Sequence, residues 1–528
     1  MRITEGHLPQ RPLPHRMERT MSSHDHFAKH MQAEQRRSMA PHQSPDGAPS
    51  PDATRTPAHT GPEQRRWWAL GFVLTGNLAV FAAVTMMNVA LPAAQQALGL
   101  TDASRAAVVT LYSLCFGAFM LLGGRLADVV GLRRCLTAGL VGFAAASLLG
   151  GVSPSAEMLL AARALQGMTG ALVAATALAM ISVMFTHGRA RARAFALFGM
   201  VMGMGTAASF TLAGALVDGF SWRWVMLITT PVALLVALGL VRTAPPTPTA
   251  GRARLGLPSA LLVTVALGLL VFGFDRASTL GWAHPATWTS LAGAVVLLGL
   301  FGLVLRRSAH PLIPPRLLAD RLRLAAFTSV FVVGIGIFAG MYILTTFLQG
   351  VLGYSALLTG LAFLPYGLSA MATSQLLTVV SGRVSAVAML VVGLFISAAA
   401  IASFILLGTD STYVTGILPA MLLLGAGGTI VMVTGSDAAT RGAGADSGIA
   451  SALVNSGQQI GAALGTALLT AIMTATTRRH LAGAGELDAT LTGYAHASAV
   501  GAAIIALSAI GVLVLARGPA GHRHRAVA

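Results

Sequence analysis

The sequence predicts an all-α polytopic membrane protein, and three observations support this fold class. First, 55% of the 528 residues are hydrophobic and only 10% are charged, whereas soluble proteins carry about 25% charged residues. Second, about fourteen apolar stretches have close to the ~20 residues with which a helix crosses a bilayer. Third, the basic residues gather in alternate connections. Long apolar runs, unlike short alternating ones, exclude a closed barrel.

The chain divides into five regions. They are a tail at 1–65, six spans within 66–241, two extra spans with basic connections within 242–323, six more spans within 324–516, and a short tail at 517–528. The expected spans are 67–91, 106–123, 135–151, 157–185, 194–216, 224–241, 257–273, 286–305, 324–345, 357–378, 386–407, 413–434, 448–474 and 494–516. The first tail lacks apolar periodicity and is rich in Pro, His and Ser, so we expect it to be disordered.

The positions of Lys and Arg predict the orientation of the spans. If the N-terminus lies inside, the inside segments hold 29 of the 35 basic residues. Cytoplasmic connections carry such an excess, so we expect a multi-pass protein of the cytoplasmic membrane with both termini in the cytoplasm. The net charge of +17 then reflects topology, and we expect the lipid bilayer, not nucleic acid, as the partner. We also expect a monomer.

Residues 124–134 (GRLADVVGLRR) form a short charged segment between two apolar spans. It resembles the signature loop G-x-L-A-D-x-x-G-R-R/K between the second and third helices of major facilitator superfamily transporters. Further segments resemble the fourteen-span drug:proton antiporter group of this superfamily, namely 85–92, 163–167, 222–231, 310–314, 348–355 and 455–461. The resemblance implies a major facilitator fold, with two six-helix bundles plus two extra central helices.

The charged loop is a candidate conformational gate. Gly124 and Gly131 permit a tight turn and close approach of helices, and Asp128 suits a helix N-terminus, where the helix dipole favours an anion. The resemblance implies that Asp128 helps to latch the cytoplasmic side, with Arg133 and Arg134 nearby. The alternative is a solvated turn that follows the positive-inside rule.

Arg163 is the one charged residue that lies well inside a predicted span. An intramembrane Arg is costly, so we expect it to face a wet cavity or a partner. The resemblance links the matching Arg to proton transfer, and Asp128, Glu157 and Asp275 are further candidates for coupling. The alternative is that Arg163 extends to the nearby headgroups.

Acidic residues are absent from the centres of the predicted spans. The antiporter group often has an Asp where this chain has Ala83, so proton coupling lacks its usual carboxylate. A cation in a cavity with Arg163 and no carboxylate would meet repulsion in low dielectric, which favours neutral or anionic hydrophobic substrates. The residues expected to line a substrate cavity are polar: Asn88, Gln166, Gln349, Asn455, Gln458 and Gln459.

The resemblance implies an exporter of hydrophobic drugs or antibiotics that works by alternating access and is driven by protons. One alternative is uptake or exchange of a small anion or neutral metabolite, with Arg163 as counter-charge. Another is a transporter-like sensor without transport. No P-loop, nucleophile–base pair or metal cluster is evident, so we expect neither an enzyme nor a cofactor. Cys115 and Cys135 are interpreted as apolar packing residues.

Overall fold

The structure is a computed structural model. It describes residues 63–186, 188–246, 257–308, 313–380, 383–443, 446–481 and 485–517. These residues form helices and no β-strand, which confirms the predicted all-α fold. They belong to one compact unit, Gly61–Ala528. Nearly all of the tails expected at 1–65 and 517–528 lies outside the described residues, so their expected disorder stays a prediction.

The N-terminal half contains seven helical pieces. They are α2 (Glu63–Leu98), α3 (Asp102–Val130), α4 (Leu132–Gly151), α5 (Ala156–Met184), α6 (Gly188–Gly219), α7 (Trp224–Leu227) and α8 (Thr229–Thr243). The hydroxyl of Thr101 caps α3 by accepting from the Ser104 N–H at 3.2 Å. The sixth predicted span is broken between α7 and α8, because Pro231 cannot donate to the carbonyl four residues earlier.

Two further long helices, α9 (Leu257–Leu280) and α10 (Pro285–Arg307), precede the short α11 (Pro315–Ala319). The C-terminal half then comprises α12 (Arg321–Thr346) with the π turn η1 (Phe347–Val351), α13 (Ala356–Ala362), α14 (Leu364–Val380), α15 (Ala386–Ala402) with η2 (Ser403–Leu406), η3 (Tyr413–Ile417) with α16 (Leu418–Thr440), α17 (Ser447–His480) and α18 (Glu486–Arg517). Pro365 explains the break between α13 and α14 in the same way as Pro231.

Eleven helices or helix pairs in the described part of the chain are long and apolar enough to cross a membrane. The other long helices are α3, α6 and α9, of 29, 32 and 24 residues. Two of them contain shorter apolar segments, at Ser104–Met120 and Leu261–Phe274. A multi-pass membrane protein is therefore the fold, while crossing by all fourteen segments stays a prediction.

Because successive long helices reverse direction, their connections alternate between two ends of the bundle. We name the ends after two glycines with positive φ, Gly99 between α2 and α3 (φ 62°) and Gly131 between α3 and α4 (φ 95°). The Gly99 end also holds the end of α6 and the start of α13. The Gly131 end also holds α11 and the start of α17.

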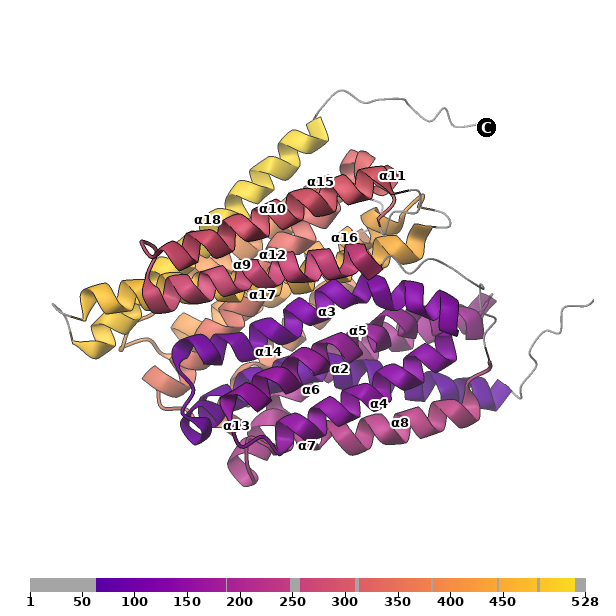
Figure 1. Cartoon of the computed structure of the whole chain (residues 1–528), viewed down its shortest axis with the longest axis horizontal. Coiled ribbons are helices and arrows are strands. Elements are labelled where there is room, and N and C mark those ends of the chain that lie inside the picture. The colour runs from indigo at the N-terminus through magenta and orange to yellow at the C-terminus, as the bar shows by residue number, and fades with distance from the viewer. Residues whose placement is uncertain are drawn as a thin grey trace, which may run out of the picture. The chain divides into compact units, whose positions relative to one another are not determined.

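The two halves meet along two seams. On one side α3 packs against α17, and on the other α6 packs against α13 and α14. The helices α9 and α10 lie side by side, and α9 contacts both α3 and α17 (Figure 1). Leu114 of α3, Leu267 and Val271 of α9, and Ala463 and Ala467 of α17 form a small apolar cluster there. The extra helices thus cover the α3–α17 seam.

Candidate functional site

The Gly131 turn has the geometry that its glycine implies. Gly131 donates its N–H to the carbonyl of Ala127 at 2.9 Å, and its own carbonyl accepts from the Cys135 N–H at 3.0 Å. One residue therefore ends α3 and begins α4, at a φ of 95° that side chains rarely adopt. Arg133 donates to the carbonyl of Ala244 at 3.2 Å and ties α4 to the end of α8.

The other gate candidates are placed differently. Arg134 is exposed. Gly124 has no atom within 4 Å of the position that a Cβ would take, so the close helix approach expected there is wrong. That approach occurs at Gly123, where a Cβ would lie 3.3 Å from Ala175 and Leu172 of α5. The side chain of Asp128 lies outside the described part of the structure, so its latch role stays a prediction.

A cluster of charges lies at the Gly131 end, where sequence patterns gave no pairing. Arg316 of α11 donates twice to Asp446, just before α17, at 2.5 and 2.9 Å. This pair, helped by the charges of Arg125 and Arg323, holds the pKa of the Asp446 carboxyl below its usual range. Since Arg125 belongs to α3, its charge acts across the two halves.

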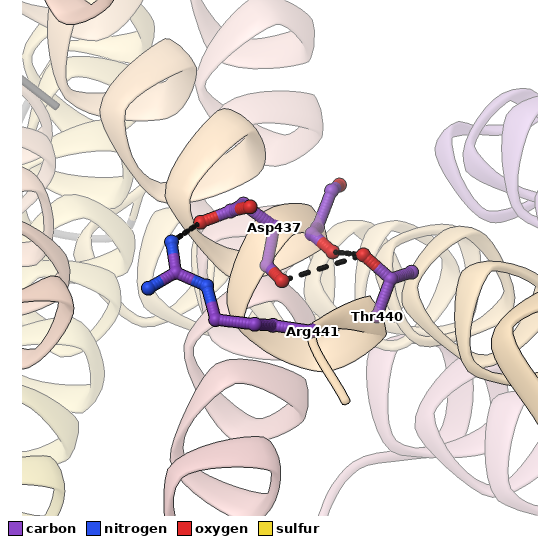
Figure 2. Close-up of polar contacts among 4 residues, drawn as sticks. Asp437, Thr440 and Arg441 are labelled. Carbon is purple, nitrogen blue, oxygen red and sulfur yellow. Dashed lines mark hydrogen bonds and ion pairs between the residues drawn. The ribbon is translucent and has the colours of Figure 1, made fainter. Parts of the chain in front are cut away.

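The end of α16 is braced beside this cluster. Figure 2 shows Arg441 reaching back to the carboxylate of Asp437, one helical turn earlier. The Thr440 hydroxyl donates to the carbonyl of Ser436 at 2.8 Å, and Arg323 donates to the carbonyl of Arg441 at 3.1 Å. These contacts stay within the C-terminal half and fix where α16 ends.

Arg163 is buried inside the N-terminal half, with 1% of its surface exposed. It donates through Nε to the Val108 carbonyl at 3.0 Å and through Nη1 to the Ala83 carbonyl at 3.4 Å. Nη1 also donates to Gln166 Oε1 at 2.5 Å. Its guanidinium lies 4.2 Å from the centre of the Tyr112 ring. Extension of Arg163 to the headgroups is therefore wrong, because its partners are backbone carbonyls of α2 and α3, Gln166 of its own helix and the Tyr112 ring.

The Arg163 network continues through Gln166 and Tyr112. Gln166 donates to the Ser147 hydroxyl of α4 at 2.8 Å, and Tyr112 donates to the Val80 carbonyl of α2 at 2.8 Å. Among the described residues, Arg163 Nη2 has no acceptor and no carboxylate pairs with the guanidinium. Tyr112 and Ser147 were not predicted, although a lone Tyr in an apolar span is a usable signal.

The remaining coupling candidates are peripheral or undescribed. Glu157 is exposed in the first turn of α5 at the Gly99 end. Asp275 belongs to α9, and its side chain lies outside the described residues. Neither is brought near Arg163 by an observed contact.

The polar cavity candidates do not form one group. Asn88 is buried, and its Oδ1 has no partner among the described residues. Gln459 is also buried, and both atoms of its amide lack partners there. Asn455 is half-buried and donates to the Ser451 carbonyl of its own helix at 3.0 Å. The backbone carbonyl of Gln458 contacts Gly334 of α12.

A cavity of about 520 Å³ lies between the halves at the Gly99 end. Its lining residues come from α2, α3, α6, α12, η1, α13 and the connection between η1 and α13. They are Pro92, Ala93, Gln95, Gln96, Arg105, Val217, Asp218, Thr346, Gln349, Gly350, Tyr354 and Ala356. Gln349, a predicted cavity residue, donates to the Val89 carbonyl at 3.1 Å and so bridges the halves. Arg105 donates to Gln95 at 2.7 Å and lies 5.0 Å from the Tyr342 ring of α12.

Two helical halves that meet along two seams, with buried polar groups between apolar helices, define a multi-pass membrane protein of the transporter class. The profile of the Major Facilitator Superfamily matches residues 73–466. Because this range is most of the chain, the protein belongs to the Major Facilitator Superfamily. Membership confirms the predicted family and places the chain among transporters, not enzymes.

Similar proteins match most of the chain. The puromycin resistance protein pur8 of Streptomyces alboniger is 40% identical over 482 residues, which are 89% of this chain and 95% of that protein. The cephamycin export protein CmcT of Amycolatopsis lactamdurans is 35% identical over 74% of this chain and 82% of its own. The crystal structure of an auto-inhibited peptide transporter of the POT family has a TM-score of 0.62 at 18% identity, covering 86% of this chain and 98% of that one; it shows the same fold.

Proposed function

We propose that this protein exports hydrophobic antibiotics across the cytoplasmic membrane by alternating access. The observation that carries the proposal is the 40% identity to a puromycin resistance protein over 95% of that protein's length. The similarity to a cephamycin export protein agrees with it. Two halves joined along two seams suit a mechanism in which the halves rock about a central site.

The proposed orientation places the Gly131 end in the cytoplasm. Arg125, Arg133 and Arg134 lie at this end, and so do Arg316 and Arg323. Cytoplasmic connections carry such an excess of basic residues. The start of α2 and the end of α18 lie at the same end, so both termini are cytoplasmic in this proposal, and the Gly99 end is the side of release.

Asn88 and Gln459 are the proposed polar contacts for substrate. Buried polar atoms are normally hydrogen-bonded, and one without a partner calls for an explanation. Asn88 Oδ1 and both amide atoms of Gln459 have this unused capacity. Gln166 is a poorer candidate, because Arg163 and Ser147 already occupy its amide. A substrate with hydroxyl or N–H groups could donate to Asn88 Oδ1 and Gln459 Oε1, and a carbonyl on the same substrate could accept from Gln459 Nε2.

The preference for neutral or anionic compounds rests on Arg163. Its buried charge has no described carboxylate partner, and charge interactions are strong in low dielectric. A cationic compound inside the N-terminal half would therefore be repelled. We also propose that transport is coupled to protons. The residues to substitute first in a test of coupling are Arg163, Glu157, Asp128 and Asp275.

Reconstituted vesicles test the proposal. Flux of a neutral and a cationic antibiotic is measured with and without a pH gradient, using the purified protein as a monomer. The surface control is Arg307→Ala, at an exposed position in the last turn of α10. We expect faster flux of the neutral compound and acceleration by the gradient. Flux that ignores the gradient removes proton coupling, and flux only of small anions or metabolites replaces export by exchange. If no compound moves, a sensor role replaces transport.

A further inference from the structure

Asp218 at the end of α6 joins the two halves. Its Oδ1 accepts from the backbone N–H of Ala356 at 3.1 Å, and its Oδ2 accepts from that of Leu357 at 2.9 Å. Both N–H groups belong to the first turn of α13, so the N-terminal half supplies the carboxylate and the C-terminal half supplies the donors. Hydrogen bonds to an ionised acceptor are about twice as strong as neutral ones.

The start of α13 depends on this contact. The first N–H groups of a helix have no partner inside the helix. Ser355, the cap within the same chain segment, accepts from only one of them, the Leu358 N–H at 3.2 Å. Asp218 accepts from the two before it. The first turn of α13 is therefore satisfied by protein in full when the halves are together, and separation returns two donors to solvent.

The seam beside Asp218 is closely packed, although Asp218 itself is exposed. Phe210 of α6 and Phe363 after α13 stack with ring centres 4.5 Å apart and planes inclined by 8°, and both are fully buried. A Cβ at Gly214 would overlap the carbonyl of Ala356, and a Cβ at Gly360 would overlap that of Phe210. The two glycines lie one helical turn before Asp218 and one turn after Ala356, so they let the backbones approach until the carboxylate reaches its donors.

We propose that Asp218 is the latch of the Gly99 end: it holds this end of the transport pathway shut, and it releases α13 when the end opens. Asp218 and Ala356 also line the cavity of about 520 Å³, so their separation opens the wall of that cavity. The inference rests on the proposed function for its meaning in transport. The contact and its test do not depend on the identity of the substrate.

Thiol labelling tests the latch. Thr346→Cys places a thiol in the wall of the same cavity, where the native side chain is 7% exposed, in a background with Cys115→Ala and Cys135→Ala. The protein is held in nanodiscs and treated with a charged maleimide. Asp218→Asn keeps the shape of the side chain but loses the charge and one acceptor. We expect its labelling rate to rise on the order of tenfold, as loss of a charged hydrogen bond predicts.

Glu486→Gln is the matched control, because Glu486 is an exposed acid in the first turn of α18 at the same end. It should label at the parent rate. Equal labelling of Asp218→Asn, Glu486→Gln and the parent overturns the latch. If Asp218→Asn fails to fold, Gly214→Ala separates the same backbones from the α6 side, and unchanged labelling of that variant overturns the latch instead. Flux assays are separate: raised labelling without any flux keeps the latch and removes the exporter, and flux with unchanged labelling does the reverse.

Discussion

The two ends of the bundle join the halves by different means. At the Gly99 end, hydrogen bonds cross between the halves from Asp218 to α13 and from Gln349 to Val89. At the Gly131 end, the Arg316–Asp446 pair connects α11 to α17, and Arg125 acts from the other half through its charge. A hydrogen bond weakens steeply with distance and angle, whereas a Coulomb interaction declines gradually. The hydrogen bonds described at the Gly99 end should therefore be lost abruptly when the halves separate.

The largest effect is expected between the ends, at Arg163. Arg163→Ala leaves Gln166 Oε1 without its donor in a buried site, at a cost of about 1–3 kcal/mol, and removes the guanidinium from the Tyr112 ring. Thermal unfolding in detergent should show a lower midpoint, while exposed Arg134→Ala should not. The Arg163 network lies inside the N-terminal half and belongs to neither end. Its loss should therefore change the rate of thiol labelling at the Gly99 end and at the Gly131 end by a similar factor. A change at one end alone would show that Arg163 acts on that end.

A smaller effect is expected from filling the Gly99-end seam. In Gly360→Ala the new methyl group overlaps the Phe210 carbonyl, and overpacking costs about 1–3 kcal/mol. Labelling of the cysteine at position 346 should rise and flux should fall. Gly408→Ala, at a position with open space in a connection of the same end, is the control. Labelling that stays at the control level would mean that the seam is looser than its contacts indicate.

The two glycines of the predicted gate should respond with opposite signs. Gly131→Ala forces a side chain into a φ of 95° and should lower stability by about 1–3 kcal/mol. Gly124→Ala adds a methyl group to a helix position with open space and should raise stability by up to ~1 kcal/mol. Thermal unfolding of the two variants in parallel decides this. Equal changes in the unfolding midpoint of the two variants would contradict the requirement for glycine at the turn between α3 and α4.

The smallest effect concerns the pH dependence of the Gly131 end. The folded-state pKa of Asp446 is lowered, so its pairing stabilises the protein above the ordinary pKa of about 3.9 and is lost as the pH falls through the lower folded value. The difference in unfolding temperature between the parent and Asp446→Asn should be constant from about pH 5 to 8 and narrow below about pH 4. If the difference in unfolding temperature grows on acidification, the pairing with Arg316 does not lower the pKa of Asp446.

The helical fold and the Gly131 turn could be predicted, because both depend on local properties. Apolar run length sets a membrane helix, and a single glycine sets a turn with positive φ. The partners of Arg163 could not be predicted in the same way. Which carbonyls face its guanidinium depends on how α2, α3 and α5 pack, and no pattern near Arg163 specifies Val108 or Ala83.

Asp218 shows the same limit at the Gly99 end. In the sequence it is one of several acids at the edge of an apolar stretch, and its donors lie 138 and 139 residues later. Gln349 was expected in a cavity because it is polar in an apolar region, and it does line one. Its bond to Val89 required the α2–η1 contact to be known. Contacts between the halves are therefore the part that only the structure supplies.

The placement of α9 has a mechanical consequence for any rocking of the halves. Leu267 and Val271 cluster with Leu114 of α3 and with Ala463 and Ala467 of α17, so relative motion of the two halves must move both surfaces across this helix. Apolar contacts have no preferred direction, and each atom pair contributes only about 0.1–0.2 kcal/mol. Such a surface can slide with little resistance. The extra helices would then guide the motion along the α3–α17 seam. The hydrogen bonds of Asp218 would hold the opposite seam, between α6 and α13.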